Sequence, residues 1–254
     1  MTYSIIGTGN IACFLGARLR MAGHQCIGIY GRRKEVAELL ADTCYAEKYG
    51  TVDDVYDGDA DVCFLAVADA AIPSVATQLS FRKTVLIHTA GAVGIEHFDG
   101  AARDYGVLWP IYSILKNNQP MHRDIPCAWE TNSPKAAKYL QEIAHGITDI
   151  LFEAKYEQRK WLHVAAVVSN NFTTHLIAIC DKICAENNLP FSVLMPIIEQ
   201  TFDRIKHGDP KTMQTGPAIR KDNSTINAQI NILEDHPDWQ KIYESITHSI
   251  QNFR

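Results

Sequence analysis

The sequence has no excess of positive charge and no pattern typical of a leader. Its 24 Lys and Arg residues are outnumbered by 29 Asp and Glu residues, which gives a formal net charge of -5 at pH 7. Such a chain is poorly suited to displacing counterions from a phosphate backbone, so we expect no nucleic-acid partner. Apolar runs such as Val164 to Val168 are far shorter than a bilayer span. We therefore expect a cytoplasmic protein without a membrane partner.

Several kinds of chemical site are also missing from the sequence. The seven cysteines include no CxxC pair, so they indicate neither a disulfide framework nor a structural zinc site. We find no cluster of residues with metal-ligand spacing, no paired-carboxylate motif and no G-x-S-x-G elbow. These absences exclude most hydrolase mechanisms, and we expect no metal.

The first twelve residues carry the most informative pattern. The apolar run Thr2–Ile6 leads into a G-x-G-x-x-A turn, which continues as a helix with apolar residues at helical spacing. This arrangement opens dinucleotide-binding folds, because glycines let a pyrophosphate approach the backbone at the start of a helix. We therefore predict that this turn binds the cofactor through Gly7, Thr8, Gly9, Asn10 and Ile11.

The end of the next predicted strand indicates which dinucleotide is bound. The run Cys26 to Tyr30 is followed by Gly31-Arg32-Arg33-Lys34, where an enzyme selective for NAD usually places an acidic residue. Guanidinium groups can instead hold a 2′-phosphate. We predict that Gly31, Arg32 and Arg33 contribute to an NADP site. The alternative is a solvated helix start, although cations there oppose the helix dipole.

Later strands of the predicted parallel sheet supply further candidates. Small residues at Ala66, Val67 and Ala68 would let the cofactor pass over the carboxyl end of the sheet, near Thr89. His88 follows another buried strand, where it could donate a proton or simply hold its loop. The remaining strand candidates are Cys44–Ala46, Val107–Tyr112, Pro126–Trp129 and Ile147–Phe152. Within them, Trp109 and Tyr112 could line a pocket or belong to the core.

From residue 155 onward the strand pattern disappears and helical patterns take over. With 254 residues and 46% apolar content, we predict two domains, 1–154 and 155–254. The longest helical pattern, Gln158 to Glu186, places His163 and Asn170 near one face among apolar neighbours. Their polar atoms need partners or line a cavity. Together with His88, they are our candidate catalytic residues.

Four segments spread over the chain resemble a known family. The chain is similar to Rossmann-fold oxidoreductases related to the deazaflavin-dependent NADP oxidoreductases and, more distantly, to pyrroline-5-carboxylate reductase. The matching segments are Ile6–Asn10, Ala66–Ile72, His88–Gly91 and Thr215–Asp222. The family usually carries histidine before proline where this chain has Trp109-Pro110, so we assign no catalytic role to that position.

The resemblance implies a fold and a reaction type. The expected fold is α/β, a doubly wound and mostly parallel Rossmann sheet followed by a smaller all-helical domain. The helical domain is expected to form a homodimer, with the active site between the two domains. The reaction would transfer a hydride between NADP(H) and a small organic substrate: a carbonyl, an imine or a deazaflavin-like acceptor. The alternative is a nucleotide-binding sensor or assembly protein without turnover.

We predict that Arg32→Glu selectively weakens NADPH binding, because the substitution replaces a phosphate-binding cation with an anion. The dissociation constant for NADPH should rise at least about tenfold, while that for NADH should change little. Titrations followed by nicotinamide fluorescence will measure both constants. An unchanged NADPH constant would instead assign the basic triplet to a solvated helix start.

Overall fold

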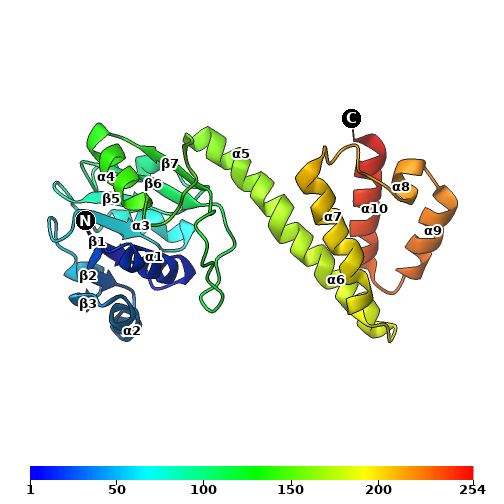
Figure 1. Ribbon diagram of the computed structural model, residues 1–254, viewed down its shortest axis with the longest axis horizontal. Coiled ribbons are helices and arrows are strands. Elements are labelled where there is room, and N and C mark those ends of the chain that lie inside the picture. The colour runs from blue at the N-terminus through cyan, green and yellow to red at the C-terminus, as the bar shows by residue number, and fades with distance from the viewer. Residues whose placement is uncertain (254) are drawn as a thin grey trace. The chain divides into compact units, whose positions relative to one another are not determined.

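The first part of the chain folds around one eight-stranded sheet, in a computed structural model that describes residues 1–253 (Figure 1). The strand order is β3-β2-β1-β4-β5-β6-β7-β8, and every neighbouring pair is parallel except β6 and β7. The strands are β1 (Thr2–Ile6), β2 (Gln25–Tyr30), β3 (Lys48–Gly50), β4 (Val62–Leu65), β5 (Val85–His88), β6 (Tyr105–Pro110), β7 (Cys127–Thr131) and β8 (Leu151–Glu153). This order confirms the predicted doubly wound, mostly parallel sheet.

Helices cover both faces of the sheet, because the central strands are apolar on both sides. One buried cluster joins the sheet to three helices, through Leu15, Leu40 and Leu140 among others. Another cluster packs Ile72 and Phe98 against the opposite face. The helices of this part are α1 (Asn10–Met21), α2 (Lys34–Cys44), α3 (Ile72–Ala76), α4 (Pro134–Ala144) and α5 (Tyr156–Ala166). The predicted strand at Cys44–Ala46 is wrong: α2 extends through Cys44, and β3 follows at Lys48–Gly50.

The loop between β6 and β7 is tied to α1 by a buried arginine. The Arg18 guanidinium donates hydrogen bonds to the backbone carbonyls of Pro120, Met121 and His122, and only 6% of Arg18 is exposed. The backbone N–H of Lys116 donates to Asn10 Oδ1 over 3.2 Å. The loop is therefore bonded to both the start and the last turn of α1 (Figure 1).

A second buried arginine fixes the start of α5. Arg159 is fully buried and forms an ion pair with Glu130 on β7. Its guanidinium also donates to the carbonyls of Ala154 and Val93, each over 3.0 Å. Since these partners come from separate segments of the sheet region, they set the position at which α5 leaves the sheet.

The chain divides into two compact units, Met1–Asn171 and Phe172–Arg254. The division lies 17 residues after the expected boundary at 154 and 155. The strands do end at Glu153, but α5 remains attached to the sheet through Arg159. The second unit is helical, as predicted. Its helices are α6 (Thr173–Glu186), α7 (Met195–His207), α8 (Pro217–Arg220), α9 (Asn223–Ile232) and α10 (Pro237–Asn252).

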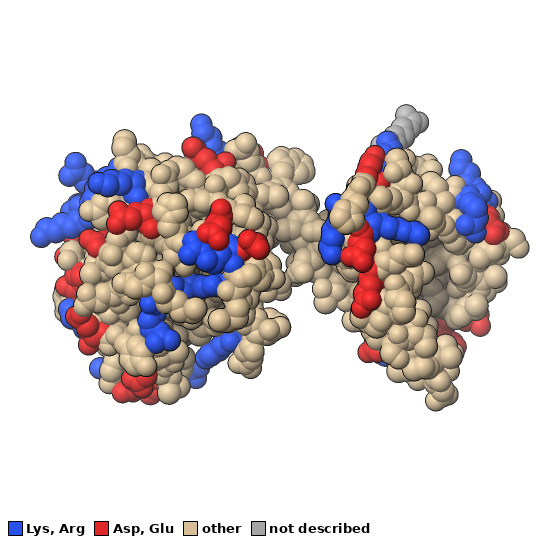
Figure 2. Space-filling model, in the orientation of Figure 1, with Lys and Arg blue, Asp and Glu red and all other residues tan. Residues whose placement is uncertain are grey.

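The face of the first unit in Figure 2 shows no single dominant charge. On the face in Figure 2, basic and acidic side chains are interspersed over the first unit, with uncharged surface between them. Among the described residues, the helical segment Tyr156–Glu186 is long and apolar enough to cross a membrane, with a mean hydropathy of 1.2 over its most apolar window. No part of that window is buried. One such helix is weak evidence for a membrane span.

We predict that Arg159→Met destabilises the first unit by about 2–4 kcal/mol, because it leaves the Glu130 carboxylate without its buried partner. Urea denaturation followed by circular dichroism will measure the loss. Lys160→Met is the matched control, since Lys160 is the adjacent cation and its contacts are an exposed pair with Glu157 and the Tyr156 ring on its own helix. Equal denaturation midpoints for the two variants would contradict the structural role of Arg159.

Candidate active site

The turn after β1 has a shape that only glycine accommodates at its first position. Gly7 has a φ of +135°, and a Cβ placed there would lie 2.1 Å from the carbonyl oxygen of Ala66. The Gly7 N–H donates to the carbonyl of Tyr30 over 2.7 Å, and the Ala66 N–H donates to that of Ile6 over 2.8 Å. The carboxyl ends of β1, β2 and β4 therefore meet at this turn.

The start of α1 is open to a ligand. Gly9 is the N-cap residue, and no side chain caps the helix or places an acid in its first turn. A Cβ at Gly9 would meet no atom within 4 Å, so the space above this backbone is free. Unbonded N–H groups at the start of a twelve-residue helix suit a pyrophosphate. The predicted Gly7–Ile11 site therefore fits a dinucleotide.

The basic residues predicted to hold a 2′-phosphate lie just beyond β2. Arg32 and Arg33 are exposed, and among the described residues neither forms an ion pair. Gly31 lies against Thr8, because a Cβ at Gly31 would be 3.0 Å from Thr8 Cγ2. The structure thus brings the second strand's end together with the glycine turn, and leaves two guanidinium groups available to an anion.

The other predicted cofactor residues follow β4 and β5 at the same edge of the sheet. Ala66 is buried, Val67 is half-buried and Ala68 is exposed, directly after β4. Thr89 is buried directly after β5. Because β1, β4 and β5 are parallel neighbours, their carboxyl ends share one edge, where ligands bind in doubly wound sheets. The binding roles of these residues stay predictions.

His88 lies in the core rather than at an open surface. It is fully buried, its ring meets the Phe98 ring edge-on at 5.4 Å, and its Nδ1 accepts a hydrogen bond from the Ala90 N–H. Burial, aided by the positive charge of Arg159, lowers the pKa of His88 to about 3. A neutral, enclosed imidazole is poorly placed to donate a proton to a ligand. The structure therefore favours the loop-holding role over the catalytic one.

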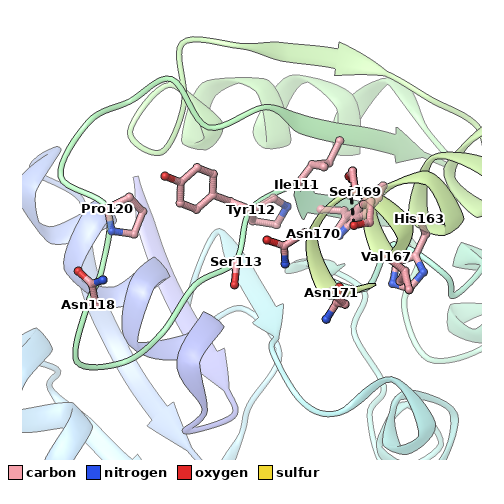
Figure 3. Close-up of a pocket in the computed structure, with 13 residues that line it drawn as sticks. Ile111, Tyr112, Ser113, Asn118, Pro120, His163, Val167, Ser169, Asn170 and Asn171 are labelled. Carbon is pink, nitrogen blue, oxygen red and sulfur yellow. Dashed lines mark hydrogen bonds between the residues drawn. The ribbon is translucent and has the colours of Figure 1, made fainter. Parts of the chain in front are cut away.

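A cavity of about 690 Å³ lies at the carboxyl end of β6. One wall comes from the loop after β6, and the other comes from α5 and the turn that follows it (Figure 3). Both His163 and Asn170 line it, as the sequence pattern suggested, while their catalytic roles stay predictions. The lining residues are Trp109, Pro110, Ile111, Tyr112, Ser113, Asn118, Pro120, His163, Ala166, Val167, Ser169, Asn170 and Asn171.

A π-helical turn shapes the second wall of the cavity. It spans Val167–Phe172 and follows α5 directly. Such turns widen the helix by one residue and often occur at functional sites. Here the turn supplies Val167, Ser169, Asn170 and Asn171 to the lining. No pattern in the sequence indicates the π-helical geometry, so Ser169 and Asn171 are absent from the predicted site.

Trp109 connects the cavity with the loop after β5. Its ring centroid lies 5.6 Å from that of His163. A Cβ at Gly91 would come within 2.4 Å of the indole, so the glycine permits this close packing. Trp109 is 8% exposed, which places it both in the core and in the cavity wall. Tyr112, in contrast, is exposed and lines the cavity mouth.

Comparisons with known proteins match both halves of the chain. Residues 2–91 match the family described as NADP oxidoreductase, coenzyme F420-dependent, and residues 125–250 match the domain of unknown function DUF2520. A crystal structure from Bacteroides fragilis, described as a candidate NADP oxidoreductase, is 32% identical with a TM-score of 0.90. It covers 98% of this chain, which covers 97% of that protein. The chain belongs to the NADP oxidoreductase family.

More distant solved structures share the fold of this NADP oxidoreductase. The imine reductase of Myxococcus stipitatus, solved with NADP+, is 14% identical with a TM-score of 0.65; the match covers 99% of this chain and 93% of that one. Pyrroline-5-carboxylate reductase of Streptococcus pyogenes is also 14% identical with a TM-score of 0.65, over 100% and 99% of the two chains. No curated protein matches the sequence.

We predict that His88 makes the oxidoreductase less stable in mild acid. The pKa of His88 is lower in the folded protein than in the unfolded chain, where it is about 6.5. The unfolded state therefore binds the extra proton. Stability from the neutral imidazole is complete above pH 6.5 and is lost as pH falls toward 3, by up to about 1.4 kcal/mol per pH unit.

Urea denaturation at pH 7 and pH 5 will test this dependence in the native protein and in His88→Leu. The variant should lose less stability between the two pH values, because it has no imidazole to protonate. If both proteins lose the same amount, His88 does not titrate on unfolding in the way its burial implies.

Proposed function

We propose that the protein uses NADPH to reduce a small organic substrate that carries a carbonyl, an imine or a deazaflavin-like acceptor. The observation that supports this most is that the glycine turn and the cavity lie at the same edge of the sheet, within the first unit. Strand β6 is parallel to β5, so the cavity at its end lies at the same sheet edge as the glycine turn. The hydrogen bond from Lys116 to Asn10 joins the cavity loop to that turn.

The dinucleotide, when bound, supplies the hydride that the acceptor carbon receives. The chain must then stabilise the negative charge that develops on the acceptor oxygen or nitrogen and provide a proton to it. His163 contributes an imidazole to the cavity lining, and it is half-buried beside Trp109. We assign the proton-donating role to His163 and an orienting role to Asn170.

The exposed Arg32 and Arg33 support NADPH rather than NADH as the reductant. A sensor without turnover would keep the same phosphate-binding residues but would need no polar cavity beside them. The His163 and Asn170 pair at the cavity wall therefore favours the enzyme. We also propose a cytoplasmic location, in keeping with the surface charge and the reduced cysteines.

We further propose that the helical unit forms a homodimer. Its described residues include only three buried apolar side chains, Cys184, Ala218 and Ile226. Large apolar side chains such as Val193, Ile197 and Ile232 are exposed instead. An apolar groove of about 360 Å³ runs along α6, α9 and α10. Surfaces of this kind are usually covered by another protein, and light scattering would then report twice the chain's mass of 28.4 kDa.

We predict that His163→Gln lowers kcat for NADPH oxidation about 100-fold or more, because glutamine cannot deliver a proton. The dissociation constant for NADPH should stay unchanged. Stopped-flow and steady-state assays with aldehydes, imines and a deazaflavin will measure both quantities. His145→Gln is the matched control, since His145 is an exposed histidine at the end of α4.

Two outcomes would contradict these assignments. An unchanged kcat in His163→Gln would remove His163 from the chemistry. Tight NADPH binding by the native protein without NADPH oxidation on any acceptor would favour the sensor.

A further inference from the structure

The cavity wall carries no permanently charged side chain. Among its thirteen lining residues there is no Lys, Arg, Asp or Glu within the described part of the chain. The polar groups are hydroxyls, amides and one imidazole, contributed for example by Ser113, Asn118 and Asn171 (Figure 3). These groups recognise neutral acceptors and donors, but they offer no fixed charge to balance an ion.

Basic residues around the cavity already have partners in the protein. The Arg18 guanidinium donates to three carbonyls of the cavity loop. Arg159, four residues before His163, is buried in its ion pair with Glu130. Lys160 pairs with Glu157 at 2.9 Å. None of these three cations is among the lining residues, and each would have to give up an existing contact to reach a ligand.

The cavity loop itself carries two cations, Lys116 and Arg123. Arg123 pairs with Asp149 at 2.6 Å and is not a lining residue, while the backbone of Lys116 lies beside α1. Burial raises the pKa of Cys13 on α1, and the positive charge of Lys116 acts in the opposite direction. The backbone of Lys116 bonds to Asn10, at the start of the same helix. The backbone of Lys116 therefore lies at the start of α1, and Lys116 is not a lining residue of the cavity.

We infer that the cavity selects a carbonyl or imine substrate that carries no carboxylate on the part of the molecule in contact with the cavity wall. A carboxylate against this wall would lose hydration without gaining a permanent opposite charge, because the proton of His163 is the one that the reduction transfers to the substrate. An uncharged carbonyl or imine needs only hydrogen bonds, which the hydroxyl, amide and imidazole groups supply. This inference rests on the proposed reduction and narrows its substrate class.

The reaction of such a substrate balances without a further reactant. Hydride adds to the carbon of the C=O or C=N bond, the oxygen or nitrogen takes one proton, and NADPH is oxidised to NADP+. The product is an alcohol or an amine. No step requires a metal or a second redox group.

Matched pairs of compounds that differ by one carboxylate will test the inference. Suitable pairs are cyclohexanone with 3-oxocyclohexanecarboxylate, and 1-pyrroline with 1-pyrroline-5-carboxylate. Calorimetric titration of the full-length protein saturated with tetrahydro-NADP, a redox-inert analogue whose reduced ring is uncharged as in NADPH, measures binding independently of turnover. In each pair the acid should bind at least about tenfold more weakly.

Two substitutions place a cation in opposite walls of the cavity. In each variant, Ser113→Arg or Asn171→Arg, the dissociation constant of the acid should approach that of its uncharged counterpart or fall below it. The reason is that a guanidinium binds a carboxylate through two hydrogen bonds. Ser113→Gln is the uncharged control for Ser113→Arg, and it should leave the ratio of the two dissociation constants unchanged. Thermal unfolding will establish that each variant is folded.

The outcomes separate this inference from the proposed function. Equal or tighter binding of the acids by the native protein overturns it, as does failure of both uncharged compounds to bind. An unchanged ratio in both folded arginine variants also overturns it. If the uncharged compounds bind preferentially but no acceptor supports NADPH oxidation, the cavity's preference for uncharged ligands stands and the proposed reduction fails.

Discussion

The close approach of two backbones at Gly7 is the constraint on which the nucleotide site depends. A single Cβ at that position would overlap the Ala66 carbonyl, which follows the neighbouring strand β4. Because Gly7 has no Cβ, β1 turns directly into α1, and the start of the helix lies at the carboxyl edge of the sheet. The distance from the turn to β4, β5 and β6 is then set by ordinary parallel pairing. The cavity shares this edge because its first wall begins where β6 ends.

Two buried guanidinium groups hold the cavity walls through different kinds of bond. Arg18 binds backbone carbonyls of the loop, whereas Arg159 binds a carboxylate on β7 as well as two carbonyls. A buried arginine is stable only when most of its donors are satisfied, so both residues restrict the segments around them. Burial accordingly lowers the pKa of Arg18 from its usual value. The wall positions depend on these polar contacts as much as on apolar packing.

The sequence predicted the parts of the molecule that follow from local patterns. The glycine turn, the apolar strands β1, β2, β4 and β5 and the helical second half all have periodic or short-range signals. His163 and Asn170 could be placed in a cavity because polar residues stood within an apolar helical stretch. In contrast, β3 has three residues and a mostly exposed surface, so it carries no apolar run to recognise.

Long-range contacts account for what sequence reasoning missed. Nothing near His88 in the chain revealed that Phe98 would enclose its ring, so its burial depended on the folded structure. The partners of Arg18 lie more than 100 residues away, and the π-helical turn is a departure from regular geometry with no compositional signature.

The Arg18 contact has an evolutionary consequence. Because it recognises main-chain carbonyls, it is indifferent to which side chains the loop carries at 120–122. Mutations in that loop can therefore alter what the cavity accepts while the tether to α1 persists. Descendants of one ancestral gene could acquire new substrates by drift in this segment, without rebuilding the nucleotide half of the enzyme.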